Sequence, residues 1–245
     1  MQDLIKFGLV PAAGLALPLA VFAGAPTANQ GISYNYLEAS YVFGNDIDID
    51  DGDVGFDAPE IDIDGFFFKG SAEVSPGIFV YASNLTLDLR IDETSGPGIK
   101  DFDLGVDNQS LGVGYHMPLM PGPAPLDVYA SLSYERLDTV GQPANGYGIT
   151  GGARWMPIQG LEINAFTGWR DFGDVGGLVD ASGVDVDIDG WIFGVGAVYN
   201  VTPKLALTAD WTRYALNADI DAGGGGDANI DFDVEAFMVG GRFYY

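Results

Sequence analysis

The last nine residues of the chain, FMVGGRFYY at positions 237–245, decide its fold class. Successive side chains of a β-strand point to opposite faces, so alternate residues of this stretch share a face. One face carries Arg242, and the other carries only apolar, aromatic or small residues. The residues of that second face are Phe237, Val239, Gly241, Phe243 and Tyr245. Such a strand is typical of a transmembrane barrel, with lipid outside and water or polar side chains inside.

The composition of the 245 residues agrees with an envelope protein. Hydrophobic residues make up 47% and charged residues 18%, and the chain has 36 glycines and no cysteine. Free thiols are a liability in oxidising compartments, so the lack of cysteine fits this location. The net charge of -25 comes from 35 acidic and 10 basic residues. This charge argues against nucleic acid as a partner, because phosphate binding needs clustered Lys and Arg, and it favours cations.

The first 28 residues are expected to be a secretory signal peptide. An apolar stretch over residues 7–22 is followed by small residues, in the order typical of such peptides. Cleavage is expected after Ala23 or Ala28, because Pro26 disfavours cleavage after Ala25. The barrel domain is then expected to cover residues 29–245. No later stretch has the ~20 consecutive apolar residues of a membrane helix, so any span must be made of strands.

Alternating segments predict an all-β fold, a closed antiparallel up-and-down transmembrane barrel of ten strands, with eight strands as the alternative. The predicted strands cover residues 33–44, 62–74, 78–90, 104–116, 127–137, 147–156, 161–172, 188–200, 204–215 and 231–245. Four connections are short and rich in Pro and Gly, and the others are longer and acidic or Gly-rich. Transmembrane barrels divide the periplasm from the exterior in this way, with short turns on one side and long loops on the other.

An internal repeat indicates that a hairpin was duplicated. The stretch IDIDGFFF at 61–68 matches VDIDGWIF at 186–193, and each copy leads into a Pro-containing turn and a further strand. The spacing of the two copies preserves which side chains share a face.

Apolar residues at every second position predict the lipid-facing side of five strands. They are Leu37, Ala39, Tyr41 and Phe43; Phe79, Tyr81, Leu85, Leu87 and Leu89; Leu161, Ile163, Ala165 and Trp169; Trp191, Phe193, Val195, Ala197 and Tyr199; and Leu205, Leu207, Ala209 and Trp211.

Charged residues on the opposite faces predict a polar lumen. They are Glu38, Lys69, Glu73, Asp88, Arg90, Glu135, Arg154, Glu162, Arg170, Asp210 and Arg242. A charge against hydrocarbon costs ~2–4 kcal/mol at mid-bilayer, and pairing across a narrow lumen removes this cost. These residues form either a core of ion pairs that fills the barrel or a selectivity lining. Ten strands favour the filled core, because open pores need ~16. Arg136 and Arg213 share the outer face near the strand ends, where they could meet lipopolysaccharide phosphates.

Two acidic stretches are weak candidates for a divalent cation, either calcium or magnesium. Their carboxylates are Asp46, Asp48, Asp50, Asp51 and Asp53, and Asp185, Asp187 and Asp189. Carboxylates at this density repel one another unless cations lie between them. The second stretch resembles the opening of an EF-hand loop, but its twelfth position is Gly196 instead of Glu. A solvated acidic loop is therefore the favoured interpretation, and no other cofactor is expected.

Catalytic residues are not expected. The one histidine, His116, ends a strand on the short-turn side, away from the loops where a surface enzyme would work. No pairing of Ser with His can be inferred, so His116 is interpreted as a polar interfacial residue. The Gly112-x-Gly114 and Gly194-x-Gly196 pairs lie inside strands with no helix after them, so they serve packing or sheet curvature and do not form a dinucleotide site.

Several short motifs resemble the small outer-membrane β-barrel proteins of Gram-negative bacteria, including porin-like and opacity-type domains. These motifs are SYNYLE at 33–38, LGVGYH at 111–116, YASLSYE at 129–135 and GRFYY at 241–245. The first two are also similar to the barrel subfamily regulated by diffusible signals. The resemblance implies an outer-membrane location and insertion by the barrel-assembly machinery through the terminal signal of residues 237–245. It supplies no active-site residues.

Three functional hypotheses follow from the sequence. The first is a monomeric, non-enzymatic outer-membrane barrel with a structural, surface-interaction or narrow-pore role, in contact with membrane lipid and lipopolysaccharide. The second is a surface protein or adhesin that binds divalent cations through acidic extracellular loops. The third, which is disfavoured, is an envelope enzyme that uses carboxylates.

Overall fold

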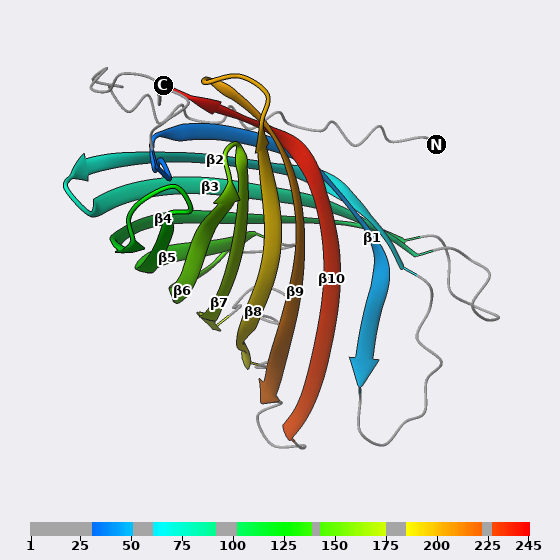
Figure 1. Cartoon of the computed structure of the whole chain (residues 1–245). Helices are drawn as coiled ribbons and strands as arrows, with labels where there is room; N and C mark the ends of the chain where they lie inside the picture. Colours follow the sequence, from blue (N-terminus) through cyan, green and yellow to red (C-terminus); the bar gives the residue numbers. More distant parts are fainter. Residues whose placement is uncertain (1–30, 51–60, 92–101, 139–142, 175–184, 222–226) are drawn as a thin grey trace.

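The computed structural model describes residues 31–50, 61–91, 102–138, 143–174, 185–221 and 227–245. These residues form ten antiparallel strands in a closed barrel, in which each strand pairs with its sequence neighbours and the last pairs with the first (Figure 1). The predicted ten-strand barrel is thereby confirmed. No helix within the described ranges is long and apolar enough to cross a membrane. The predicted signal peptide lies outside the described residues.

The strands are long enough to cross a bilayer at a tilt. They are β1 (Tyr36–Asp50), β2 (Ile61–Ser75), β3 (Ile78–Ile91), β4 (Phe102–Met120), β5 (Leu126–Asp138), β6 (Ala144–Ile158), β7 (Leu161–Asp174), β8 (Asp185–Asn200), β9 (Leu205–Asp221) and β10 (Asp227–Tyr244).

Short turns join the strands at one end of the barrel. Gly77 and Gly160 have positive φ values of 77° and 86°, a conformation that glycine adopts at little cost and that closes the β2–β3 and β6–β7 turns. The opposite ends extend further than the sequence predicts, since β9 continues to Asp221 where the prediction stops at residue 215. Asp219 and Asp221 alternate there with Ala218 and Ile220, and the backbone pairing with β10 continues to Asp221.

A ring of outward-facing aromatic side chains marks the bilayer boundary on the long-loop side. The ring consists of Phe43, Phe66, Tyr134, Tyr147, Trp169, Trp191, Trp211 and Phe237. On seven strands, the residue two positions closer to the long loops than the aromatic residue is polar. These residues are Asp64, Arg136, Asn145, Asp171, Asp189, Arg213 and Glu235. Aromatic rings prefer the headgroup level, so the outer surface changes from lipid-facing to water-facing at this ring.

The lipid-facing prediction is correct for β1, β7, β8 and β9, where the apolar series points outward. Leu37, Ile163, Trp191 and Leu207 are between 41% and 60% exposed in the isolated barrel, as expected for residues that lipid would cover. On β10, Phe237 and Phe243 also face outward.

The prediction for β3 is wrong, because its apolar series points into the lumen. Phe79, Tyr81 and Leu87 are buried, and Leu85 also faces the lumen, where it lines the internal cavity with the two rings. Leu89 packs against the same internal cluster.

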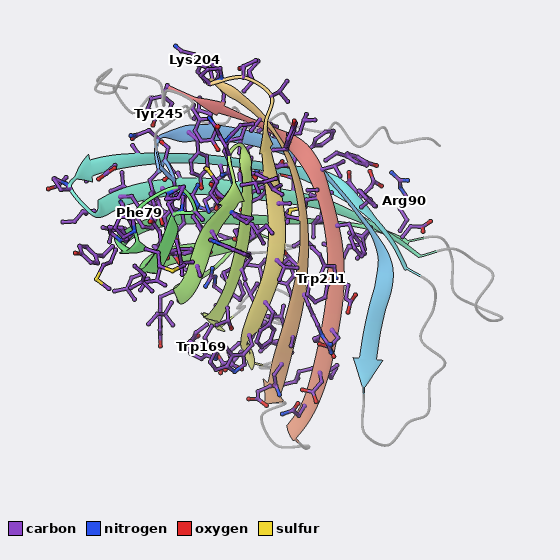
Figure 2. The ribbon with its side chains drawn as sticks, in the orientation of Figure 1. Phe79, Arg90, Trp169, Lys204, Trp211 and Tyr245 are labelled. Carbon is purple, nitrogen blue, oxygen red and sulfur yellow. The ribbon has the colours of Figure 1, made fainter. Side chains whose placement is uncertain are left out.

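The prediction that Asp88 and Arg90 line the lumen is wrong for the same reason. Both residues alternate with the buried series and are exposed on the outer side. The Arg90 guanidinium lies 3.0 Å from the Asp64 carboxylate, above the aromatic ring of the barrel. Figure 2 shows Arg90 outside the barrel wall, where this ion pair and solvent exposure replace the lumen contacts that the sequence predicts.

Glycines make room for large rings inside the barrel. Tyr81 pairs in register with Gly112, Phe79 with Gly114, and Phe166 with Gly194. A Cβ at any of these glycines would overlap the ring on the neighbouring strand. The Gly-x-Gly pairs therefore serve packing, as the sequence predicts, and they explain how aromatic residues fit within a narrow lumen.

The outer surface gives a direct test of membrane depth. Val195 lies midway along the outward face of β8, between Trp191 and Tyr199. Val195→Arg should lower the free energy of unfolding by about 2–4 kcal/mol, because it places a charge against hydrocarbon. Equilibrium denaturation in lipid vesicles, followed by tryptophan fluorescence, measures this change. Gln109→Arg on β4, beyond the lipid-facing zone, should cost about 0–1 kcal/mol. Equal losses at the two positions would contradict this placement of the bilayer.

Candidate functional site

Four buried charged residues meet in the lumen near the short-turn end, and we call them the basal network. They are Glu38 of β1, Arg154 of β6, Glu162 of β7 and Arg242 of β10. Arg154 donates two hydrogen bonds to the Glu162 carboxylate, at 2.8 and 3.0 Å. Arg242 binds Glu38 at 2.7 Å and lies 3.6 Å from Glu162. Glu162 thus joins two ion pairs from opposite sides of the barrel into one network.

Register brings these residues together. Glu38 pairs directly with Arg242 across β1 and β10, so their side chains share the inner face. All four residues are at most 8% exposed. Charges at this depth lose their hydration, so each needs a partner of opposite sign and well-aligned hydrogen bonds. Arg154 and the two glutamates meet this requirement within the lumen, whereas the Nη1 atom of Arg242, 3.6 Å from Glu162, has no hydrogen-bond partner among the described residues.

Tyrosine rings cover the two guanidinium groups. Arg154 lies 4.5 Å from the centre of the Tyr34 ring, and Arg242 lies 4.2 Å from that of Tyr36. A guanidinium over an aromatic face is attracted to the ring quadrupole, more strongly when water is excluded. The rings and ion pairs thus lie together at this level of the lumen.

The segment before β1 adds a cover below the basal network. Tyr34 is 3% exposed, and its ring stacks on His116 at 3.9 Å between centroids. The Ser33 carbonyl accepts a hydrogen bond from Arg154 at 3.0 Å, and the Asn35 side chain accepts one from the Glu73 backbone at 2.8 Å. Burial raises the pKa of the Tyr34 hydroxyl above its ordinary value, so this side chain stays neutral.

His116 lies inside the base of the barrel and not at the lipid interface that the sequence analysis assigns to it. Its Nδ1 is 3.4 Å from an Asp127 carboxylate oxygen, and its Nε2 is 3.6 Å from one of Glu73. The imidazole is enclosed by Tyr34 and Phe79. This position fits a packing role at the base of the lumen.

A second buried ion pair lies on the other side of the lumen. The Arg170 Nε is 3.0 Å from Glu135, which is fully buried. Glu135 also accepts hydrogen bonds from Ser110 and Ser133, and Arg170 donates one to the Thr150 hydroxyl at 3.0 Å. Several donors therefore satisfy the Glu135 carboxylate.

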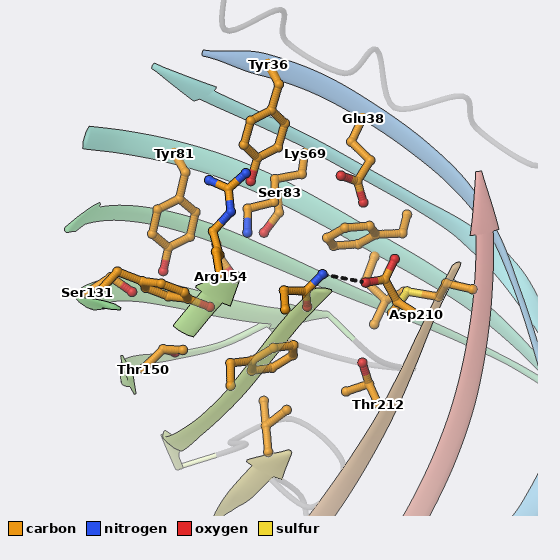
Figure 3. A pocket seen from close by; sticks show the side chains of 18 of the residues that line it. Tyr36, Glu38, Lys69, Tyr81, Ser83, Ser131, Thr150, Arg154, Asp210 and Thr212 are labelled. Atoms are coloured by element: carbon orange, nitrogen blue, oxygen red, sulfur yellow. Dashed lines mark hydrogen bonds between the residues drawn. The ribbon is translucent and has the colours of Figure 1, made fainter. Parts of the chain in front are cut away.

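An internal cavity of about 190 Å³ lies among these groups (Figure 3). Its wall includes the basal network, the Glu135–Arg170 pair and several aromatic rings. Lys69 of β2 and Asp210 of β9 also line it, from different sides. The Lys69 ammonium lies 5.2 Å from the centre of the Tyr81 ring, and Asp210 accepts a hydrogen bond from Asn164 at 3.5 Å.

Eight of the eleven residues predicted for the lumen line this cavity. They are Glu38, Lys69, Glu135, Arg154, Glu162, Arg170, Asp210 and Arg242. Glu73 points inward but lies at the rim beside His116, where its side chain is 33% exposed. Asp88 and Arg90 lie outside, as described above. The sequence analysis missed Tyr34 and Asp127, although the inward alternation of Asp127 with Glu135 could have indicated the latter.

The outer face near the long loops carries exposed ion pairs. Arg136 lies 3.2 Å from Asp138, and Arg213 lies 2.8 Å from Asp233. Their outward position agrees with the face predicted for Arg136 and Arg213. Contact of these arginines with lipopolysaccharide stays a prediction.

The metal candidates lie at the same end of the barrel. In register, Asp46, Asp48 and Asp50 of β1 pair with Glu235, Asp233 and Asp231 of β10. Asp187 and Asp189 pair with Asp219 and Asn217, and Asp185 pairs with Asp221. Asp51 and Asp53 lie outside the described residues. Among the residues that the structure describes, no group of three potential ligands is arranged to hold a metal ion.

Among the comparisons with known proteins, the family model agrees with the barrel fold. The family model for the outer membrane protein beta-barrel domain matches residues 14–243. OprG from Pseudomonas aeruginosa is 13% identical, with 86% of this chain and 94% of that chain covered and a TM-score of 0.35. The outer membrane protease OmpT from Escherichia coli is 11% identical, with 89% and 100% covered and a TM-score of 0.43. AlkL is 15% identical, with 91% and 96% covered and a TM-score of 0.39. No curated protein sequence matches the chain.

The basal network predicts that two substitutions of a carboxylate by its amide differ greatly in their effect on the free energy of unfolding. Glu162→Gln should cost about 3–5 kcal/mol of unfolding free energy, because it leaves two buried arginines short of a partner. Asp233→Asn, which breaks the exposed pair with Arg213, should cost about 0–1 kcal/mol. Denaturant titration of the refolded barrel in vesicles compares them. A loss below about 1 kcal/mol for Glu162→Gln would show that the network is not buried as described.

Proposed function

This chain belongs to the outer membrane β-barrel protein family, and from that premise we propose that it is a non-enzymatic barrel whose lumen is closed at the periplasmic end. The protein is located in the outer membrane of a Gram-negative bacterium. In this proposal it is not a general diffusion pore. The barrel presents its long-loop end to the exterior and keeps a small internal cavity above a sealed base.

The basal network carries the proposal. A conducting pore needs a continuous water path, and at the base Arg154, Glu162, Arg242 and Glu38 extend into the lumen as buried, mutually paired side chains. Tyr34 covers the network from below. Displacing such a network would expose buried charges that lack partners, which is costly. The seal is therefore expected to persist at equilibrium.

The non-enzymatic part of the proposal is supported by the surroundings of the one histidine. His116 lies between two carboxylates and under an aromatic ring, at the short-turn end. The hydroxyl groups of Ser110 and Ser133 both donate to Glu135, which is paired with Arg170 and fully buried. A base that activates a nucleophile needs a substrate within reach, and these groups are instead engaged with one another.

Conductance in planar lipid bilayers tests the closed lumen. The wild-type barrel, inserted at high salt, should give no steady channel steps. The double variant Tyr34→Ala/Arg154→Ser removes the cover and one side of the network, so it should give steps. Tyr134→Ala, which truncates an exposed outer ring, is the matched control and should stay silent. Steady, ohmic conductance of the wild-type protein would overturn the proposal.

A second candidate function, attachment to lipopolysaccharide through divalent cations, is favoured by the register of β1 with β10. Three acidic residues of β1 pair there with three of β10, and Arg213 is bound to one of the latter. Like charges opposite one another destabilise a sheet unless counterions lie between them. Since the described residues form no coordination site, we propose loosely held Mg²⁺ or Ca²⁺ that bridges this end to lipid phosphates.

Thermal unfolding with added salt tests the cation proposal. Millimolar MgCl₂ should raise the unfolding temperature of the barrel more than NaCl of equal ionic strength, because divalent ions compensate paired carboxylates better. The variant Asp231→Asn/Glu235→Gln should reduce the difference between the salts, whereas Asp62→Asn on β2, whose register partner is Arg90, should leave it unchanged. Equal effects of the two salts on the wild-type protein would rule out a role for divalent cations.

A further inference from the structure

The cavity holds a lysine that forms no ion pair among the described residues. Lys69 extends from β2 into the cavity, where its ammonium nitrogen lies 5.2 Å from the centre of the Tyr81 ring. None of the described carboxylates forms an ion pair with it, in contrast to Arg154, Arg170 and Arg242. We propose that the cavity is a binding site for a small organic monoanion with one ring, and that Lys69 is its counterion.

The pairing of charges in the cavity wall supports an anion site. The wall carries four positive charges, from Lys69, Arg154, Arg170 and Arg242, and four negative charges, from Glu38, Glu135, Glu162 and Asp210, so its formal charge is zero. Glu38 pairs in register with Lys69 across β1 and β2, but its carboxylate is held at 2.7 Å by Arg242. The three glutamates are engaged by arginines, which leaves Lys69 and Asp210 as the charges of the wall that form no ion pair among the described residues. In a lumen with little water, a carboxylate bound beside Lys69 would give its ammonium an ion-pair partner.

Asp210 limits the charge of the ligand. Among the described residues, it is the carboxylate of the cavity wall that forms no ion pair. It lies across the cavity from Lys69 (Figure 3). A ligand with a second negative charge would place that charge close to Asp210. Because charges of like sign repel strongly where water is scarce, a dianion is disfavoured.

Hydroxyl groups near Lys69 can complete the anion site. Ser83 is the register partner of Lys69 on β3, and the side chains of Ser83, Tyr36 and Lys69 converge in the cavity (Figure 3). Hydroxyl and ammonium groups both donate hydrogen bonds, and a carboxylate accepts up to about four. A carboxylate is therefore the anionic group that fits these donors.

The size and apolar wall of the cavity define the rest of the ligand. A cavity of ~150 Å³ with an apolar lining holds benzene, and this cavity has a volume of about 190 Å³. Phe67, Leu85 and Met238 line it together with the polar groups. The space therefore suits one six-membered ring that carries a single carboxylate, and benzoate is a suitable probe.

Isothermal titration of the refolded barrel with benzoate tests the proposal. The wild-type protein should bind benzoate with one site, and Lys69→Gln should weaken binding at least tenfold. Lys204→Gln removes the same charge from an exposed periplasmic turn, so its affinity should equal that of the wild type. Benzyl alcohol, which lacks the charge, should not bind measurably. No binding of benzoate to the wild type, or equal binding by Lys69→Gln, would overturn the proposal and leave Lys69 as a structural residue only.

The ligand charge gives a second test. Terephthalate, which has a carboxylate at each end of the ring, should bind the wild type at least tenfold more weakly than benzoate. Asp210→Asn should reduce this discrimination, because it removes the repelling charge. Unchanged discrimination would overturn the role of Asp210.

A measurement on the wild-type protein avoids dependence on variants that fail to fold. Brief acetylation followed by mass spectrometry reports the reactivity of each lysine. Benzoate should slow acetylation of Lys69 and leave Lys204 unaffected. Equal rates with and without benzoate at Lys69 would contradict occupation of the cavity. This outcome does not depend on conductance, so it is distinguishable from failure of the closed-lumen proposal.

Discussion

The structure depends on one constraint, that no backbone N–H or C=O group can remain unpaired in hydrocarbon. An open sheet would leave two edges in lipid at a cost of several kcal/mol for each unpaired group, so the sheet must close. Here closure is made by β1 and β10, which pair from Tyr36 with Tyr244 onward. The terminal alternation of residues 237–245 serves this contact, with its apolar face turned to lipid and Arg242 turned inward. Once the sheet is closed, each of the remaining strands also has one face toward lipid and one face toward the lumen.

Closure creates a lumen that is too narrow for ordinary hydration of charges. The barrel deals with this limit in two ways on its two sides. Around β5 to β7 and β10, arginines and glutamates pair with one another. Around β2 to β4, leucines and aromatic rings pack against glycines of the neighbouring strand. The lumen is therefore part polar core and part apolar core, and the cavity lies where the two meet.

This division explains what the sequence could and could not predict. The number of strands and four lipid-facing series follow from alternation, because residues such as Trp191 and Leu207 alternate with small or polar ones. On β3, Leu85 and Leu87 also alternate with polar residues, but the polar side is the outer one above the bilayer. Alternation fixes which residues share a face and not which face is inside, so Asp88 and Arg90 were assigned wrongly. The pairing of Glu162 with two arginines depends on register around the whole ring, which no local pattern contains.

The sealed base and the acidic exterior together bear on how an anion could reach the cavity. In the closed-lumen proposal, entry comes from the long-loop end, where the protein carries much of its negative charge. On β2, Lys69 lies seven residues from Asp62, a span of about 23 Å at ~3.3 Å per residue. The Debye length at physiological salt is ~8 Å, so repulsion by the acidic end decays well before Lys69. A monoanion therefore meets a weak barrier outside and an unpaired cation within, whereas a polyanion is repelled in proportion to its charge at both the entrance and Asp210.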